Sequence, residues 1–520
     1  MGAAIAATLT LSAAIAQAAA SAREAHSASG HSLAADTRFY LPPPAAGAIQ
    51  QAAGLLGSDD FTDAALIAKM ELVPSAVWLD GETQAEAARG TTGELRANRD
   101  VARQVRQALV GAGLERSVPV FVAYNIPGRD CSQYSAGGAP SDAAYDAWID
   151  SIRGALGDAQ AVVILEPDAL ANLPGYCGAG YNASFPDITN TTRLADVAYG
   201  VQTLENDPNI SVYLDGGHSA WQAVGNIAQV LVAADVQQAQ GVFFDVSNYQ
   251  YATNNAFYGT WVSSCIAYGT QVEDETQSTA LSYAPSLTAA DNSASGAFAS
   301  CPNQYWNGGP ANNWSGTAMS PYGVWSETNG NAALSTAGID SRYASMLGTA
   351  VPATHFVIDT SRDGQGPNDM QAYAAPPYEQ PANVISSLQG GNWCNPPGSG
   401  LGTQPTADTG AIANSLDAYL AADTPLLDAY LWVKTPGQSD GQCDIAGGVR
   451  AWQDYTAAGA GGGDTPAIPG WPTSSSSAWT TFDPLWSTQT NTLITDPAAG
   501  AWFPQQALQL AQDANPQLSH

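Results

Sequence analysis

Two carboxylates, Glu166 and Asp168, directly follow the apolar run Val162–Leu165. Four apolar, mostly β-branched residues predict a strand that is buried on both faces, as in a parallel sheet, and Pro167 cannot continue its hydrogen-bonded ladder. Carboxylates beside apolar surface are costly unless they are hydrogen-bonded or used in chemistry, and general acid–base catalysis is the chemistry that carboxyl groups perform there. The alternative is a plain strand end at which Asp168 caps the following turn. These residues alone leave both interpretations open.

The elements that would position such groups are short apolar runs that alternate with helical patterns. The seven predicted strands are Ala76–Asp80, Val118–Tyr124, Ala161–Glu166, Ser211–Asp215, Gly241–Val246, Thr354–Asp359 and Asp428–Lys434. The clearest predicted helices are Gly93–Leu114, Ala143–Leu156, Arg193–Leu204 and His218–Ala234. Alternating strands and helices with buried strands predict an α/β fold with a parallel sheet, and this number of units favours a βα barrel.

Polar residues stand at the carboxyl end of nearly every predicted strand. They are Asp80, Tyr124, Asp168, Asp215, Asn248, Asp359 and Lys434. In a βα barrel the carboxyl ends of the strands meet at one face, where active sites are assembled. Loops after strands are often polar in any case, but a set made mostly of carboxylates favours a functional site over ordinary loop polarity.

The composition restricts the class of partner. The chain has 520 residues, with 47 acidic against 16 basic side chains and a net charge of -31. This charge repels phosphate backbones and anionic lipid surfaces, so we expect no nucleic acid and no membrane as partner. A neutral or cationic substrate fits better, and the 14 tryptophans and 21 tyrosines suit stacking against sugars.

The amino-terminal residues have the composition of an export signal. Residues 1–20 are apolar and rich in alanine and end in an A-x-A-like site, although the usual basic start is missing. We therefore expect a secreted protein with a signal-peptide-like segment at 1–20, a disordered leader at 21–35 and one catalytic domain at 36–520. The six cysteines then favour disulfides, and nearest-neighbour pairing predicts Cys131–Cys177, Cys265–Cys301 and Cys394–Cys443.

Two segments are longer than a minimal barrel requires. They lie near residues 257–348 and 444–498 and are rich in Gly, Ser, Asn and Pro. Loops of this length are functional or disordered. They are expected to be lids or walls over the site, or disordered insertions.

Several motifs together resemble glycoside hydrolase family 6, the inverting cellulases. The two signature stretches are Val122–Gly138, which contains Tyr124-Asn-Ile-Pro-Gly-Arg129-Asp130-Cys131, and Ile164–Asp168. Further agreement comes from Val212–Trp221, Asn248, His355–Arg362, Trp393–Pro397, Leu431–Lys434 and Gly500–Phe503. The resemblance runs from about Thr37 to the carboxyl end, apart from the two long segments. It implies a distorted seven-stranded parallel βα barrel, TIM-like, with long loop insertions.

The resemblance also implies roles for the strand-end carboxylates. The Asp168 position is the family's general acid, Asp130 raises its pKa, and Tyr124 helps to distort the sugar at the cleavage point. Asp440 matches the candidate base, and nearby Arg129 and Lys434 are expected to keep it ionised. The alternative for Asp440 is a turn residue in Ser-Asp-Gly. Many relatives carry Glu where Gln438 stands, so one charge is absent here.

Substrate-binding roles are predicted for aromatic and polar residues around these groups. Trp221 and Trp393 are expected to be sugar platforms, with core packing as the alternative. His218 is expected to donate a hydrogen bond to substrate, because the five histidines form no metal-ligand pair. The other predicted substrate-binding residues are Asp215, Asn248, Lys434, Arg129 and Trp78. No metal and no cofactor are predicted, since phosphate-loop and dinucleotide motifs are absent from the sequence.

The sequence thus predicts a secreted, monomeric cellulase that hydrolyses β-1,4-glucosidic bonds with inversion. The residues of the motifs resemble those of endoglucanases, whereas the two long segments could cover the active site and form a tunnel, as in a cellobiohydrolase. The alternative of another class is a carbohydrate-binding protein that has lost catalysis. In that case Gln438, where many relatives carry Glu, would be one of the changes that accompanied the loss.

Overall fold

The computed structural model describes residues 33–81, 91–132, 134–177, 179–273, 294–305, 316–376, 379, 382–410, 426–443, 483, 485–486, 490, 492 and 494–518. Its centre is one sheet of seven parallel strands in the order β1-β2-β3-β4-β5-β6-β7. The strands are β1 (Val77–Asp80), β2 (Val120–Tyr124), β3 (Ala161–Leu165), β4 (Ile210–Asp215), β5 (Gly241–Phe244), β6 (His355–Asp359) and β7 (Leu427–Leu431). All seven predicted strands are confirmed, as is the distorted parallel βα barrel.

Alternate side chains of each strand enter two separate cores. In β3, Val162 and Ile164 face the barrel interior, where they pack with Tyr213 and Val357. Residues in between, such as Val163, belong to the larger core between sheet and helices. Apolar surface is buried on both faces, which explains why the strands are continuous apolar runs rather than alternating patterns.

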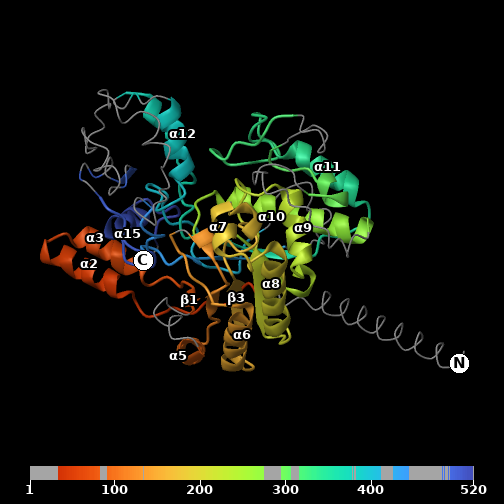
Figure 1. Ribbon diagram of the computed structural model, residues 1–520. Helices are drawn as coiled ribbons and strands as arrows, with labels where there is room; N and C mark the ends of the chain where they lie inside the picture. Colours follow the sequence, from red (N-terminus) through yellow and green to blue (C-terminus); the bar gives the residue numbers. More distant parts are fainter. Residues whose placement is uncertain are drawn as a thin grey trace, which may run out of the picture.

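Helices cover the outer face of the sheet (Figure 1). They include α5 (Thr91–Glu115), α6 (Asp142–Leu156), α8 (Asn190–Leu204), α9 (Val224–Ala233) and α10 (Ala252–Ala267), and α11 (Ala337–Leu347) packs on α10. Two further helices lie outside this layer: α7 (Ala179–Ser184), and α12 (Ala382–Gly391), which packs in a separate cluster beside the Cys394–Cys443 disulfide. The predicted helices 93–114, 143–156 and 193–204 are confirmed. The predicted start of the fourth at His218 is wrong, because Gly217 has φ 64° and Ala223 is extended, so the helix begins only at Val224. Residues 218–223 are left as a loop at the end of β4.

The two ends of the described chain meet beside the first and last strands. Helices α2 (Ala46–Gly57) and α3 (Phe61–Met70) pack against α15 (Pro504–Gln512), and Figure 1 shows the three together. Their apolar side chains enclose Trp432, which follows β7. In the described sheet no ladder joins β7 to β1; instead Ala76 N–H donates to the carbonyl of Trp432 at 2.9 Å. The helices therefore cover a seam where the barrel is not closed by strand pairing.

Three disulfides join Cys131 to Cys177, Cys265 to Cys301, and Cys394 to Cys443, which confirms the predicted pairing. The second joins α10 to residues 294–305 and lies in the outer core. The described parts of 257–348 thus include a helix that covers the sheet, and Trp261 and Trp325 stack in that core at 5.5 Å.

Several sequence predictions lie outside the described residues. These are the signal-like segment 1–20, the leader 21–35 except for its last three residues, and most of 444–498. Leu33, at the end of the predicted leader, is buried against the barrel interior. Among the described helices, none is both long and apolar enough to cross a membrane.

A buried polar network crosses the barrel interior near the start of β7. The Asp428 carboxylate accepts hydrogen bonds from Tyr213 Oη at 2.7 Å and Gln240 Nε2 at 2.9 Å, and its other oxygen lies 2.8 Å from His355 Nδ1. Burial lowers the pKa of His355, but the hydrogen bond to Asp428 and its charge outweigh burial, so the net shift is upward. A protonated His355 therefore stabilises the fold.

This network predicts a pH-dependent stability. Because the pKa of His355 is raised in the folded state, its contribution is complete below the unfolded pKa of about 6.5 and is lost as pH rises through the folded pKa. Asp428→Asn is expected to lower the free energy of unfolding by about 1–3 kcal/mol and to flatten its decline between pH 6 and 8. Urea titrations of both proteins across this range measure the effect; an equal slope in the variant would contradict it.

Candidate active site

The carboxyl ends of the strands are tied together by two buried carboxylates. Asp359, at the end of β6, accepts the N–H groups of Ser247, Val433 and Lys434 at 2.9–3.1 Å. It therefore links the loops after β5, β6 and β7. Glu166 does the same for the loop after β2, because its carboxylate accepts the N–H groups of Asn125 and Ile126. These bonds keep the strand-end loops in fixed relative positions.

Asp168 lies among other carboxylates at this end of the barrel. Burial raises its pKa well above the usual range, and the charges of Asp215, Asp130 and Asp440 raise it further, against the opposing effect of Lys434. Asp215, rather than Asp168, accepts the N–H groups of the following turn, at 2.8 Å from Ala171. The capping alternative for Asp168 is therefore not what is observed, and its carboxyl group is favoured in the protonated form.

Asp440 has the opposite electrostatic environment. Arg362 donates to both of its carboxylate oxygens, at 2.7 and 2.8 Å, and Lys434 Nζ lies 2.9 Å from Oδ1. The Asn395 N–H adds a bond of 2.9 Å to Oδ2. Burial alone would raise the pKa of Asp440, but the Arg362 and Lys434 charges hold it well below its usual range. One carboxyl group favoured as an acid and one held as a carboxylate thus belong to the same cluster.

Arg129 is not the cation that pairs with Asp440. Its guanidinium lies over the ring of Tyr124, 4.3 Å from the centroid, and donates to the carbonyls of Tyr124 and Ser135. The prediction that Arg129 holds Asp440 ionised is therefore corrected: Arg362, from the loop after β6, takes that place beside Lys434. Arg129 orders the loop after β2 instead.

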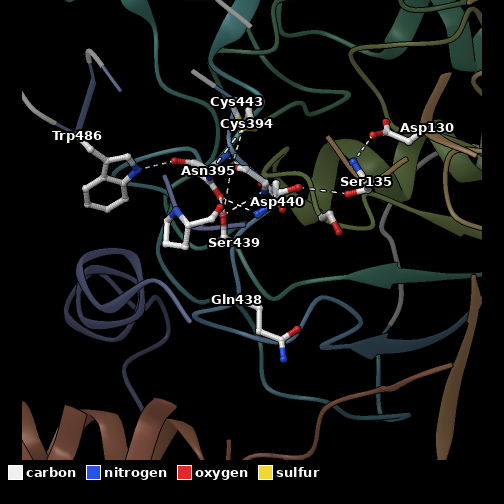
Figure 2. Close-up of a disulfide and its surroundings, with 12 residues drawn as sticks. Asp130, Ser135, Cys394, Asn395, Gln438, Ser439, Asp440, Cys443 and Trp486 are labelled. Carbon is white, nitrogen blue, oxygen red and sulfur yellow. Dashed lines mark hydrogen bonds between the residues drawn. A yellow bond between two sulfur atoms is a disulfide. The ribbon is translucent and has the colours of Figure 1, made fainter. Parts of the chain in front are cut away.

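Asp130 is held by the same loop. Its Oδ2 accepts the Ser135 N–H at 2.6 Å, and Ser135 Oγ in turn donates to the carbonyl of Asp440 at 3.2 Å (Figure 2). Burial raises the pKa of Asp130 to about 6, although the Ser135 bond and the Arg129 charge work in the other direction. Ser135 therefore connects the loops that carry the two carboxylates.

The predicted aromatic residues have different degrees of exposure. Trp393 is 38% exposed and lies against Tyr134, with ring centroids 5.6 Å apart, which suits a platform. Trp221 is half-buried beside His218 at 5.6 Å. Trp78 packs edge-on against Tyr124 at 5.4 Å, and its indole N–H donates to the carbonyl of Val433. None of the three belongs to the outer core: Trp78 lies in β1 and packs against the interior core, and Trp221 and Trp393 lie in loops.

The polar candidates are anchored by their own loops. His218 Nδ1 accepts the N–H of Ala220, and burial lowers the pKa of His218 to about 3, so the ring is neutral and its Nε2 carries the proton. Asn248 Nδ2 donates to the carbonyl of Val246 at 3.2 Å. A neutral imidazole with Nε2–H fits the predicted hydrogen-bond donor.

Sequence reasoning missed three residues around Asp440. Arg362 ends the motif His355–Arg362, and Asn395 belongs to the motif Trp393–Pro397, but neither residue was assigned a role. Trp486 belongs to the long segment after the last strand, and its indole N–H donates to the carbonyl of Asn395 at 2.7 Å. No local pattern marks these contacts, because each joins segments that are tens of residues apart.

Comparisons with known proteins identify the family of the chain. The profile of the family described as Glycosyl hydrolases family 6 matches residues 34–467. Endoglucanase A of Thermobispora bispora is 28% identical over 356 residues, which are 68% of this chain and 50% of that protein. The probable 1,4-beta-D-glucan cellobiohydrolase C of Aspergillus niger is 30% identical over 406 residues, 75% of this chain and 64% of that protein.

Solved structures show the same fold. A glycoside hydrolase family 6 enzyme from Coprinopsis cinerea superposes with a TM-score of 0.51 at 18% identity, covering 93% of this chain and 98% of that one. The chain spans only about half to two thirds of the curated relatives it matches. At this identity the structural likeness concerns the fold alone.

Proposed function

Because the chain belongs to glycosyl hydrolase family 6, we propose that it hydrolyses β-1,4-glucosidic bonds of cellulose with inversion of configuration, and that it acts outside the cell. The observation that carries the proposal is the pairing of a carboxyl group favoured as an acid, Asp168, with a carboxylate held ionised by two cations, Asp440. Inverting hydrolysis requires one carboxyl group of each kind.

In the proposed reaction Asp168 gives its proton to the glycosidic oxygen as the bond from that oxygen to the anomeric carbon breaks. Water attacks the anomeric carbon from the opposite face, and its proton passes to Asp440, directly or through further water. The leaving sugar departs as an alcohol, and Asp168 is left ionised until it regains a proton. Tyr124, over which Arg129 lies, is proposed to contact the sugar ring at the cleavage point.

Sugar binding is assigned to the residues that line this end of the barrel. Trp393, Trp221 and Trp78 offer ring faces or edges to glucose, and His218 offers its Nε2–H. Asn248, Lys434, Arg129 and Asp215 complete the proposed set, Asp215 by fixing the turn that carries Asp168. No nucleic acid or membrane partner is proposed, and we propose a monomer.

Release of reducing sugar from soluble β-1,4-glucan tests this function. Proton NMR of a fresh cello-oligosaccharide digest should show the α-anomer first, as inversion requires. A protein that binds cello-oligosaccharides without any hydrolysis would support the carbohydrate-binding alternative, and a β-anomer product would refute inversion. We favour internal cleavage, which lowers the viscosity of carboxymethylcellulose early; steady cellobiose release with little viscosity change would indicate a cellobiohydrolase.

Asp130 supplies a prediction about pH. Its charge raises the pKa of Asp168, so Asp130→Asn should lower that pKa. Since the acid must be protonated, activity is lost as pH rises through its pKa, and the alkaline limb of kcat/KM should move to lower pH by on the order of 1 unit. A pH–rate profile on cellohexaose measures this shift. An alkaline limb that stays in place would mean that the two carboxyl groups do not interact.

A further inference from the structure

Asn395 joins two loops at a buried point beside the Cys394–Cys443 disulfide (Figure 2). Its side-chain oxygen accepts the Asp440 N–H at 2.7 Å, and its side-chain nitrogen donates to the carbonyl of Gly441 at 3.0 Å. Its own backbone N–H donates to Asp440 Oδ2 at 2.9 Å. One fully buried residue therefore holds both the backbone and the carboxylate of Asp440.

The backbone of Asn395 has the conformation that this double contact needs. Its φ is 45°, in the left-handed region, which asparagine tolerates better than most residues. The disulfide joins the neighbouring residues Cys394 and Cys443, whereas the hydrogen bond from this loop to the Asp440 carboxylate comes from the Asn395 N–H. The amide of Asn395, not the disulfide alone, thus sets where Asp440 stands relative to Arg362 and Lys434.

Trp486 holds Asn395 from the other side. Its indole N–H donates to the carbonyl of Asn395 at 2.7 Å, and the ring is 2% exposed and packs on Phe503 at 5.1 Å. The Asp483 side chain accepts the N–H groups of Leu485 and Trp486, which holds the backbone of Trp486 in place. The segment after the last strand therefore reaches the loop that carries Asp440.

We propose that Asn395 is a positioning residue for hydrolysis, that it aligns Asp440 for its role as base, and that Trp486 maintains the backbone conformation in which it does so. This inference rests on the proposed function. Its basis is the hydrogen-bond chain Trp486–Asn395–Asp440, which reaches both the backbone N–H and the carboxylate of Asp440. A misplacement of about 1 Å in a catalytic group can cost about 100-fold in rate.

Two variants separate the contacts. Asn395→Gly keeps the backbone N–H and tolerates φ 45° but removes the amide, so kcat on cellohexaose should fall about 10- to 100-fold with KM within about twofold. Trp486→Phe keeps most of the ring and removes one hydrogen bond, so kcat should fall only about 3- to 10-fold. Trp502→Phe is the matched control: it also removes an indole N–H bond, to Gln51 Oε1 at 2.7 Å, and should keep the wild-type kcat.

Asn395→Asp distinguishes positioning from packing. The new side chain keeps an oxygen that can accept the Asp440 N–H, as Asn395 Oδ1 does in the wild type. It also places a second carboxylate beside Asp440, which should raise the pKa of Asp440. Because a base must be ionised, activity falls as pH falls through that pKa, so the acidic limb should move to higher pH. A merely structural role would leave both limbs unchanged.

Crystal structures of Asn395→Gly and Trp486→Phe complete the test without relying on turnover. The proposal expects the Asp440 carboxylate to move from Arg362 in Asn395→Gly, while thermal unfolding remains cooperative. Wild-type kcat in both variants, or an unmoved Asp440 with reduced activity, would overturn it. If the wild-type protein hydrolyses no glucan, the proposed function fails, and the crystal structures alone still decide whether Asn395 positions Asp440.

Discussion

Asp168→Asn is expected to lower kcat on cellohexaose by about 10²- to 10⁴-fold while the affinity for cello-oligosaccharides stays near that of the wild type. The amide has almost the same shape but cannot donate a proton to the leaving oxygen. Burial and the neighbouring carboxylates disfavour a charge on Asp168 more than Lys434 favours it, so a neutral amide at this position should affect folding little. Calorimetric titration of the ligand and steady-state kinetics measure the two quantities.

Substrates with different leaving groups test directly whether Asp168 acts by donating a proton. Aryl cellobiosides with acidic phenols need little protonation of the leaving oxygen, so Asp168→Asn should lose far less activity on them than on cellohexaose. Asp187→Asn, which changes an exposed carboxylate, serves as the control and should match the wild type on both substrates. Equal losses on both substrates would exclude Asp168 as the general acid.

Asp440→Asn is expected to reduce both activity and stability. It leaves Arg362, whose side chain is 1% exposed, and Lys434, 10% exposed, without their anion. Breaking a buried ion pair by removal of one partner costs about 3–5 kcal/mol, and we expect a loss of this order in the free energy of unfolding. Removal of the candidate base should lower kcat by a further factor of about 10²–10⁴.

The stability effect has a defined pH dependence. The folded pKa of Asp440 is depressed, so its contribution is present above the unfolded pKa of about 3.9 and is lost as pH falls through the folded pKa. The difference in the free energy of unfolding between wild type and Asp440→Asn, measured by urea titrations, should therefore be full at pH 6 and should narrow progressively as pH falls below about 4. Lys434→Met combined with Asp440→Asn should cost less than the sum of the single changes. Strict additivity would show that the two groups do not interact.

The barrel could be predicted from the sequence because its strands carry their own signal. Val162–Leu165 and its counterparts are apolar on both faces, and the parallel sheet makes each of them a continuous run. The strand-end rule then placed Asp168, Asp215 and Lys434 at one face before any contact was known. The features that recur in each βα unit, an apolar strand and a polar residue at its carboxyl end, could therefore be predicted from the sequence.

The contacts of the site could not be foreseen in the same way. Arg362 and Arg129 are both arginines after strands, and only the fold decides which one reaches Asp440. Trp486 lies in the long segment 444–498, for which a lid, a wall or a disordered insertion was expected, and its buried ring donates a hydrogen bond to the carbonyl of Asn395. His218 fits a helical pattern, but the left-handed Gly217 delays the helix to Val224. Each outcome depends on a partner distant in sequence or on one backbone angle.

The seam between β1 and β7 has a consequence for the order in which the chain acquires its structure. Each pair of adjacent strands from β1 to β7 is also consecutive in sequence, so the sheet can grow strand by strand during synthesis. The cover over the seam joins α2 and α3 to α15, more than 400 residues later, and loop-closure entropy makes such contacts slow to form. A nascent chain is therefore expected to hold the paired strands with the seam uncovered until α15 has left the ribosome. The environment of Trp432, which is buried among the side chains of α2, α3 and α15, is expected to change in that docking step.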